Sequence, residues 1–509
     1  MKVHLMFAGR DFDPSAPRQP CIDAVAADLE LEHLFSAMAG DDQWLLRNAS
    51  KTVTQLLVDV GEIRYRQDAL KDCIEREGVV RRLYDLATGV LEAERRRVFR
   101  SSRSPSAVMY WSVEVLKILV EGLRDLRRIA DAAAGSFASD AFQRFFTTVR
   151  LELSDEYLAE VEQQLRKLKF RDGMLLSARL GEGNKGTDYV LCDLPSDDRG
   201  WLARLFDFGS SGPHTFRIAD RDDAGARALS SLRDRGLNVV ANAVAQSCDH
   251  LVSFFEMLRT ELAFYVGCLN LHARLTYLGV PISFPEPLEL GTRFLEGRDI
   301  VDPCLALRMS GAPVANDLDG DGANLLIFTG ANQGGKSTFL RALGVACVMM
   351  QCGMFVAVRS FRASVSANVF THFRREEDAT MKSGKLDEEL HRMSDLVDAL
   401  RPDSMVLFNE SFSSTNEQEG SEIARQIVAA LLEARQRLAF VTHQHEFART
   451  FLGRSDVVFM RAQRLDDGTR TFKLLKAEPL RTSFGPDLFR TVFGETPTGL
   501  ARGAPLKEG

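Results

Sequence analysis

The sequence predicts a mainly α-helical N-terminal part, a small β-rich insertion and an α/β domain at the C-terminus. Apolar residues recur at helical spacing between residues 21 and 173, where Pro105 alone interrupts the pattern. An apolar stripe of the same period runs through residues 244–266, which is typical of one long helix. From residue 286 onwards, short apolar runs alternate with helical patterns, as they do in α/β domains.

Length, composition and charge limit what this chain can be. The 509 residues allow about three or four domains. Apolar residues make up 45% and charged residues 27%, which excludes a collagen-like or wholly disordered chain. The 64 Lys and Arg residues are outnumbered by 71 Asp and Glu, so nucleic acid would have to bind at a local patch, an assembly or a partner. No apolar run reaches the roughly 20 residues that cross a bilayer, so we expect a cytoplasmic protein without a membrane partner.

Shifts in composition predict six segments along the chain. They are an irregular N-terminal segment (1–20), a first helical core (21–173), a small β-rich insertion that is a candidate reduced clamp (174–220), a long lever helix that returns to the core (221–285), the α/β domain (286–494) and a flexible tail (495–509).

A glycine-rich loop between a predicted strand and a predicted helix is the strongest motif. It fits G-x-x-x-x-G-K-[ST] and follows the apolar run 325–328. Glycines let backbone N–H groups turn towards phosphate oxygens, and the helix N-terminus adds partial positive charge. Lys336 would neutralise the β- and γ-phosphates of ATP, and the Ser337 hydroxyl would be a ligand of Mg²⁺. The predicted ATP-binding residues are Gly330, Ala331, Asn332, Gln333, Gly334, Gly335, Lys336, Ser337 and Thr338.

A second apolar strand, residues 404–408, leads into Asn409 and Glu410. In P-loop enzymes the first of these positions is an Asp that holds Mg²⁺, and a following Glu commonly polarises the attacking water. Asn409 brings no negative charge, so we expect it to hold the metal weakly or through water. Glu410 is the predicted general base. The alternative is a surface carboxylate beyond the end of a strand.

The next apolar strand, residues 438–441, ends at Thr442 and His443, 33 positions after Glu410. A histidine at such a strand end can hydrogen-bond a γ-phosphate or the attacking water. His443 is therefore the second predicted catalytic residue, and the alternative is a structural histidine.

These motifs together resemble the MutS mismatch-repair family of ABC-type ATPases. Residues 329–338, T-G-A-N-Q-G-G-K-S-T, look like the family's T-G-P-N-M-G-G-K-S-T. Residues 410–420 match the length of its E-I-G-R-G-T-S-T-Y-D-G, although Phe412, Ser413 and Ser414 replace the first glycine, the arginine and the second glycine. The resemblance implies an ABC-type P-loop ATPase domain over 286–494 that uses ATP and Mg²⁺. It also implies a homodimer that binds DNA, with other repair proteins as further candidate partners.

In the family a second subunit completes the nucleotide site, and three residues are carried over as candidates for that contact. Residues 378–392 resemble the family's S-x-F-x-x-E-M segment, in which Ser383 is out of register by one and Glu389 aligns. Thr415 coincides with a threonine of the family's loop after the catalytic Glu. The alternative for residues 378–392 is an ordinary amphipathic helix. Nothing before the helical core matches a mismatch-recognition domain, so we expect a truncated form.

Basic runs on the helical part are the candidate DNA contacts. Arg and Lys neutralise phosphates in a salt-dependent manner that does not depend on sequence. Each run also has acidic neighbours, so the alternative is a solvated helix face. The candidates are Arg95, Arg96, Arg97, Arg100, Arg103, Lys167 and Lys169.

Two functions follow from these observations. The first is a MutS-like ATP-binding and ATP-hydrolysing protein, a nucleotide-driven dimer that clamps DNA in repair or recombination and recognises structure rather than sequence. The second is a nucleotide-gated switch with weak or no ATP turnover, because of Asn409, that binds a protein partner. A chromosome-organising ATPase with long coiled arms is excluded, because Asn409 follows Lys336 by only 73 positions.

Overall fold

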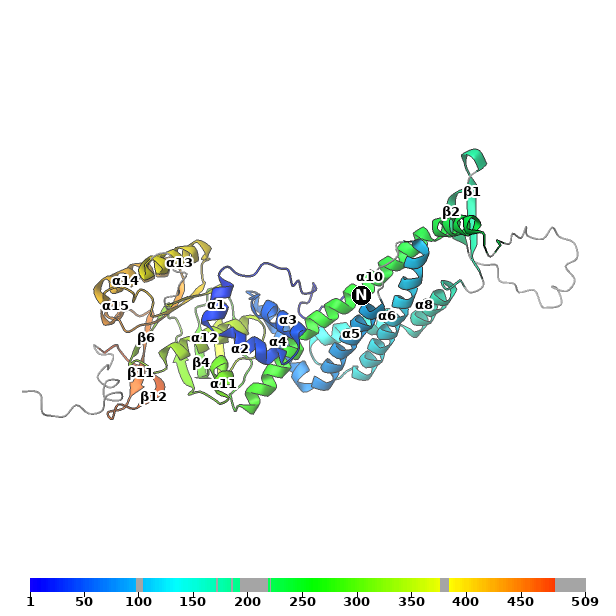
Figure 1. Ribbon diagram of the computed structural model, residues 1–509. Coiled ribbons are helices and arrows are strands. Elements are labelled where there is room, and N and C mark those ends of the chain that lie inside the picture. The colour runs from blue at the N-terminus through cyan, green and yellow to red at the C-terminus, as the bar shows by residue number, and fades with distance from the viewer. Residues whose placement is uncertain are drawn as a thin grey trace, which may run out of the picture. The chain divides into compact units, whose positions relative to one another are not determined.

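The computed structural model describes residues 1–97, 104–170, 173–184, 186–192, 218–219, 221–375 and 384–480. The chain forms two compact units (Figure 1). Unit 1 comprises residues 1–3, 78–137 and 142–262, and unit 2 comprises residues 4–77, 138–141 and 263–509. Within the described ranges, no helix combines the length and the apolar character that crossing a membrane requires.

Unit 1 is built mainly of helices. At the middle of α6, a side chain on Gly122 would overlap Val90 of α5 and press on Phe255 of α10, so the three helices approach closely there. A two-stranded antiparallel hairpin, β1–β2, lies within the predicted β-rich insertion. The elements are α5 (Glu77–Arg97), α6 (Pro105–Ala133), α7 (Asp140–Glu152), α8 (Asp155–Lys167), β1 (Leu175–Leu180), β2 (Gly186–Cys192) and α10 (Asp223–Tyr277), of which α5, α7 and α10 continue into unit 2.

A six-stranded sheet forms the centre of unit 2. Its strand order is β12-β11-β6-β10-β9-β8, and every neighbouring pair is parallel except β11–β12. Since parallel strands place their carboxyl ends at one edge, the residues that follow β6, β9 and β10 meet there. The strands are β6 (Leu325–Gly330), β8 (Val369–Phe373), β9 (Met405–Asn409), β10 (Arg437–Val441), β11 (Val457–Arg464) and β12 (Arg470–Lys476).

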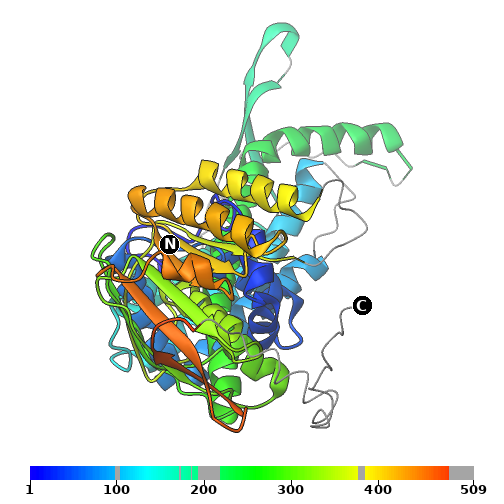
Figure 2. The ribbon, with the colours of Figure 1, turned by 90° about the vertical axis from the view of Figure 1, so that its left-hand side faces the viewer.

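Helices cover both faces of this sheet because its strands are apolar on both sides. Val406 and Phe408 of β9 pack with α13 and α14, which lie side by side over the sheet in Figure 2. Leu407 points to the opposite face, where it meets Gly344 of α12. These helices are α12 (Lys336–Gln351), α13 (Lys385–Ala399), α14 (Glu417–Glu433) and α15 (His445–Arg449). The predicted helical part followed by an α/β domain is confirmed.

A second, four-stranded sheet stands beside the glycine-rich loop. Its order is β3-β7-β4-β5, with β3 parallel to β7 and the other neighbours antiparallel. The helix α11 follows β4. The elements are β3 (Glu286–Leu288), β4 (Leu295–Ile300), α11 (Pro303–Met309), β5 (Asn316–Asp319) and β7 (Ser360–Ser364).

The structure divides the predicted helical core, residues 21–173, between the two units. Its first four helices pack within unit 2, where Leu29 contacts the position of Gly344 on α12. A helical period shows which face of a helix is apolar, but not what that face packs against. These helices are α1 (Ile22–Asp28), α2 (Leu31–Ala39), α3 (Gln43–Val53) and α4 (Val60–Glu75).

The predicted irregular N-terminal segment has no helix or strand, yet it is firmly packed. Leu5, Met6 and Phe7 are buried. The Tyr265 hydroxyl donates to the carbonyl of Leu5 at 2.6 Å, and the buried Arg66 lies 4.4 Å from the ring centre of Phe7. Leu5, Met6, Phe7 and Phe12 therefore belong to the core of unit 2, whereas residues 8–10 between them are exposed.

Candidate functional site

A cavity of about 680 Å³ opens at the edge where β6, β9 and β10 end. The glycine-rich loop from Asn332 to Thr338 forms one wall, and Glu410 and His443 face it. The remaining wall combines apolar and charged side chains from both sheets and from α11 with the segments that flank it. They include Ile300, Asp302, Leu305, Met309, Pro313, Val314, Asn316, Arg374 and Phe472.

The glycine-rich loop needs glycine at two positions for steric reasons. Gly330 ends β6 with φ 107°, and a Cβ atom there would lie 2.9 Å from the backbone nitrogen of Ala462. Gly335 has φ 88° and precedes α12, so it is the residue from which the helix starts. Residues other than glycine rarely adopt these angles, so the loop can turn its backbone tightly around the start of α12.

Lys336 is held inside the loop rather than in solvent. Its side chain is only 4% exposed, and Nζ donates to the carbonyls of Gly330 at 3.0 Å and Ala331 at 2.9 Å. Burial lowers the pKa of Lys336, while the negative charge of Glu410 acts in the opposite direction. The ammonium group therefore lies at the cavity wall, where the two loop carbonyls accept its hydrogen bonds.

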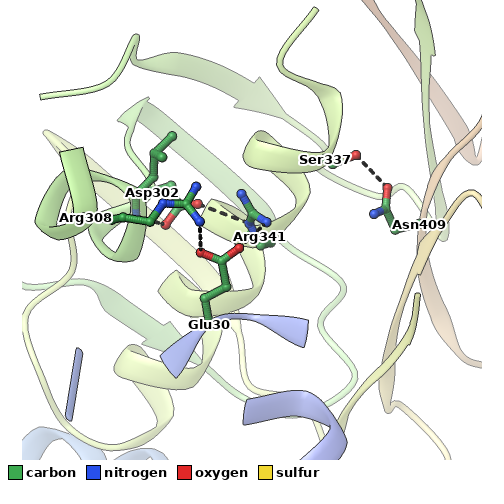
Figure 3. A network of polar contacts seen from close by, with 7 residues as sticks. Glu30, Asp302, Arg308, Ser337, Arg341 and Asn409 are labelled. Carbon is green, nitrogen blue, oxygen red and sulfur yellow. Dashed lines mark hydrogen bonds and ion pairs between the residues drawn. The ribbon is translucent and has the colours of Figure 1, made fainter. Parts of the chain in front are cut away.

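Ser337, which lines the cavity, contacts Asn409 at the end of β9. The Ser337 hydroxyl donates to Oδ1 of Asn409 at 2.7 Å (Figure 3). Asn409 is the last residue of β9, where it pairs with Phe373 of β8 and Val441 of β10. Both oxygens are of the neutral type that Mg²⁺ accepts as ligands, so the pair fits a magnesium ion, although it supplies no negative charge.

The structure brings the two predicted catalytic residues together. Nδ1 of His443 lies 4.0 Å from Oε1 of Glu410, and both side chains are partly exposed. Glu410 has φ 52°, and its backbone N–H donates to the carbonyl of Val441 at 2.9 Å. The backbone of β10 therefore fixes the position from which the Glu410 side chain reaches the cavity.

The three candidates for contact with a second subunit differ in their settings. Glu389 is 3% exposed, and its two carboxylate oxygens accept from the Phe412 N–H at 3.1 Å and the Ser414 hydroxyl at 3.2 Å. Its carboxylate is thus engaged within its own chain. The Thr415 hydroxyl donates to Glu419 at 2.6 Å. Ser383 lies outside the described residues.

The candidate DNA contacts that the structure describes lie in unit 1, and acidic side chains interact with Arg96, Arg97 and Lys169. Arg95, Arg96 and Arg97 are exposed at the end of α5, and Arg96 pairs with Glu92 at 3.3 Å. The pKa of Glu114 is held below its usual range, first by a hydrogen bond from Lys117 and also by the charges of Lys169 and Arg97. Lys167 is the last residue of α8. Arg100 and Arg103 lie outside the described residues.

Phe472 lines the cavity, although no sequence motif pointed to it. It adopts φ 57° on β12 and is 48% exposed. Asn316 holds this strand, because Nδ2 donates to the Phe472 carbonyl at 3.1 Å and Oδ1 accepts from the Leu474 N–H at 2.7 Å. The β11–β12 hairpin carries no motif, so only the folded structure places Phe472 beside Gly335.

Asp302 and Arg374 are two further cavity residues that sequence reasoning missed. Arg374 follows β8, and its backbone N–H donates to the carbonyl of Asn409 at 3.0 Å. Asp302 caps α11 by accepting from the Leu305 N–H at 3.0 Å. Burial raises the pKa of Asp302, against the effect of that hydrogen bond and of the Arg341 charge.

An ionic network connects Asp302 to the N-terminal helices (Figure 3). Arg341 of α12 contacts Asp302 at 3.4 Å and donates to Glu30 at 2.7 Å. The other oxygen of Glu30 accepts from Arg308 of α11 at 2.9 Å. One carboxylate just before α2 therefore ties together the two helices that wall the cavity.

Comparison with protein families finds two matches that cover the helical part and the α/β domain separately. The MutS2 N-terminal domain matches residues 58–278, and MutS domain V matches residues 326–492.

Several curated proteins align with parts of this chain. The DNA mismatch repair protein MutS of Chloroflexus aurantiacus is 27% identical over 223 residues, which are 43% of this chain and 23% of that protein. The DNA mismatch repair protein MutS of Porphyromonas gingivalis is 34% identical over 173 residues, which are 33% and 19% of the two chains. The MutS protein homolog 4 of Mus musculus is 29% identical over 195 residues, which are 36% and 20%. The chain thus spans less than a quarter of the length of these relatives. Both family matches and these relatives agree, and the chain belongs to the MutS family.

Proposed function

We propose that this chain binds ATP in the cavity of unit 2, hydrolyses it slowly, and uses the nucleotide to control its binding to DNA in repair or recombination. The observation that carries the proposal is the convergence of Lys336, Ser337, Glu410 and His443 on one cavity. The proposed fold type of this domain is an ABC-type P-loop ATPase.

The lining of the cavity suits the two chemical parts of a nucleotide. Backbone N–H groups of the glycine-rich loop and the Lys336 ammonium would bind the phosphates. Met309, Pro313 and Phe472 offer apolar surface to the base and the sugar. The combination of a cationic group and apolar surface in one cavity supports ATP rather than a bare phosphate as the ligand.

The residues that would hold a magnesium ion are Ser337 and Asn409. When bound there, the ion would neutralise negative charge on the phosphates. Glu410 would accept a proton from the attacking water, and His443 would donate a hydrogen bond to the γ-phosphate or orient that water. The neutral Ser337–Asn409 pair supports slow turnover, because it lacks the charge that an Asp would add.

The same pair favours a second candidate function. A site that binds ATP but scarcely hydrolyses it would act as a nucleotide-gated switch that binds a protein partner. A measurement of ATP turnover distinguishes the two candidate functions, since both require nucleotide binding through Lys336.

DNA binding, dimer formation and a place in mismatch repair are proposed from the family and from the names of the relatives. Among the described residues, the exposed Arg95–Arg97, Lys167 and Lys169 are the proposed phosphate contacts. A homodimer would place Ser383 or Thr415 of one subunit at the nucleotide of the other. We propose that the protein works in the cytoplasm.

The test measures ATP binding, phosphate release and DNA binding on the full chain. Homoduplex, mismatched and branched DNA are compared at low and physiological salt, with and without ATP. We expect saturable ATP binding and DNA affinity that falls as salt rises. Absence of DNA binding at low salt would exclude the DNA clamp, and absence of ATP binding would exclude both candidates.

A further inference from the structure

The segment 410–415, called here the Glu410 loop, connects β9 to α14 and has an unusual backbone. Glu410 has φ 52° and Phe412 has φ 60°, a region that residues with a side chain seldom adopt. Phe412 also stands where the resembling family has a glycine. The surrounding structure must therefore hold the loop in this conformation.

Side chains from outside the Glu410 loop contact it on three sides. Glu389 of α13 accepts from the Phe412 N–H and the Ser414 hydroxyl. Gln444 donates to the Phe412 carbonyl at 3.2 Å. The Phe412 ring stacks on the ring of His372 with 5.2 Å between centroids and 21° between planes.

Glu389 is the one charged group among these contacts and the best placed to control the loop. It accepts one hydrogen bond with each oxygen, from two residues that lie two and four positions after Glu410. The carboxylate is buried, so water cannot replace it readily as an acceptor. The backbone of Phe412 therefore has its position fixed by a side chain from another helix.

We propose that Glu389 is a positioning residue that holds the Glu410 loop so that Glu410 faces the cavity. The inference deepens the proposed function and rests on it for its catalytic readout. A carboxylate that must accept a proton from water works only within a narrow range of positions, and a shift of the loop would move it directly. Glu389 itself does not line the cavity.

The first test compares two acid-to-amide changes on the same helix. In Glu389→Gln, the amide oxygen can still accept from the Phe412 N–H, but the NH₂ group has to donate to the Ser414 hydroxyl. The negative charge is lost, so both hydrogen bonds to the loop become weaker. We expect kcat for ATP hydrolysis to fall about tenfold, and the Kd for ATP to change less than about twofold. The control is Asp387→Asn, because Asp387 is 56% exposed and lies 3.9 Å from its partner His391. We expect this control to leave both constants within about twofold of wild type.

A double variant shows whether Glu389 acts through the loop or through general stability. Ser414→Ala removes only the second donor, and we expect a smaller fall in kcat. If both act on one loop position, Glu389→Gln combined with Ser414→Ala should lose less than the product of the single losses. A strictly multiplicative loss would contradict the proposal.

The second readout needs neither ATP nor turnover. Hydrogen exchange of peptides that contain Phe412 should be about tenfold faster in Glu389→Gln than in wild type, and unchanged in Asp387→Asn. Unchanged exchange in Glu389→Gln would overturn the proposal, as would faster exchange with unchanged kcat. A wild-type protein without turnover would refute hydrolysis instead, and the exchange result would still decide whether Glu389 holds the loop.

Discussion

Charged side chains are arranged differently in the two units. In unit 2, Lys336, Glu410 and His443 come from the ends of three parallel strands and line one cavity. In unit 1, basic side chains pair with acids nearby, as Arg124 does with Glu162 at 2.5 Å. A parallel sheet collects its strand ends at one edge, whereas a helix distributes its side chains along its length.

This difference explains why strand-end motifs are better guides to a site than basic runs on helices. A polar residue that follows a buried parallel strand lies at the edge of the sheet where the carboxyl ends of all the parallel strands meet. An arginine on a helix usually has an acid three or four positions away, as Arg128 has in Asp125 at 2.6 Å. Exposed pairs of this kind contribute only about 0–1 kcal/mol and do not indicate a partner.

The largest expected effect tests the cavity formed by Lys336, Glu410 and His443 directly. Lys336→Ala should raise the Kd for ATP about 100-fold, because it removes a charged hydrogen-bond donor to phosphate. Isothermal titration calorimetry measures this constant. Lys476→Ala, an exposed lysine of β12, is the matched control and should bind ATP like wild type. Equal losses of ATP affinity in both variants would show that the cavity lysine and the surface lysine do not differ in their effect on ATP binding.

The buried polar groups of unit 2 predict a sensitivity to acid that a surface pair lacks. Burial lowers the pKa of His372 to about 4, so the folded chain keeps this ring neutral. The unfolded chain binds a proton near pH 6.5, so the stability from His372 is present above that pH and is lost as the pH falls towards 4. The loss at pH 5 amounts to about 2 kcal/mol.

Thermal melting checks this acid sensitivity. We expect the Tm to fall between pH 7.5 and pH 5 by more in wild type than in His372→Gln, which has no ring to protonate. Buried carboxylates such as Asp302, whose pKa is raised, act in the opposite direction but are present in both proteins. Parallel pH profiles for the two proteins would show that His372 is not a neutral buried group.

The change Asn409→Asp tests the proposed magnesium site. Asn409→Asp adds a negative charge next to Ser337, and we expect about tenfold less Mg²⁺ to be needed for half-maximal ATP turnover. Asn416→Asp is the control, because either residue can accept the Glu419 N–H at the start of α14. Unchanged turnover in Asn409→Asp at every Mg²⁺ concentration would mean that Asn409 does not limit hydrolysis.

The smallest expected effect concerns the helical unit. Arg96→Gln alone should weaken DNA binding less than about twofold, because Arg96 already pairs with Glu92. The triple change of Arg95, Arg96 and Arg97 to Gln should also reduce the salt dependence of binding. A tenfold loss from Arg96→Gln would show that a paired helix arginine can form a specific site after all.

Sequence reasoning could predict the centre of the site because its parts are local. The strand, glycine-rich loop and helix around Lys336 are continuous in the chain, Asn409 ends the apolar strand β9, and His443 follows the apolar strand β10 by two residues. Phe472 and Glu389 could not be assigned in the same way. Phe472 reaches the cavity through a hairpin without a motif, and Glu389 faces inward because of hydrogen bonds to a distant loop.

The division into units also depended on contacts that the sequence does not display. The apolar faces of α1–α4 have the same period as those of α5–α8, although they pack in different units. Which elements a helix packs against depends on the shapes of the side chains that meet at the contact, such as Leu29 against Gly344. Periodicity therefore predicted the helices but not the unit to which each belongs.

The residue at position 420, a glycine in this chain, indicates the conformation of the Glu410 loop, and it can be compared between related sequences. Any side chain at this position would overlap the Phe412 carbonyl and crowd the Gln444 amide. The residue is thus small because of the shape of a neighbouring loop rather than because of its own backbone. A related chain with a larger residue at the matching position must hold its corresponding loop differently. The identity of this one residue therefore reports on the conformation of a loop several residues away.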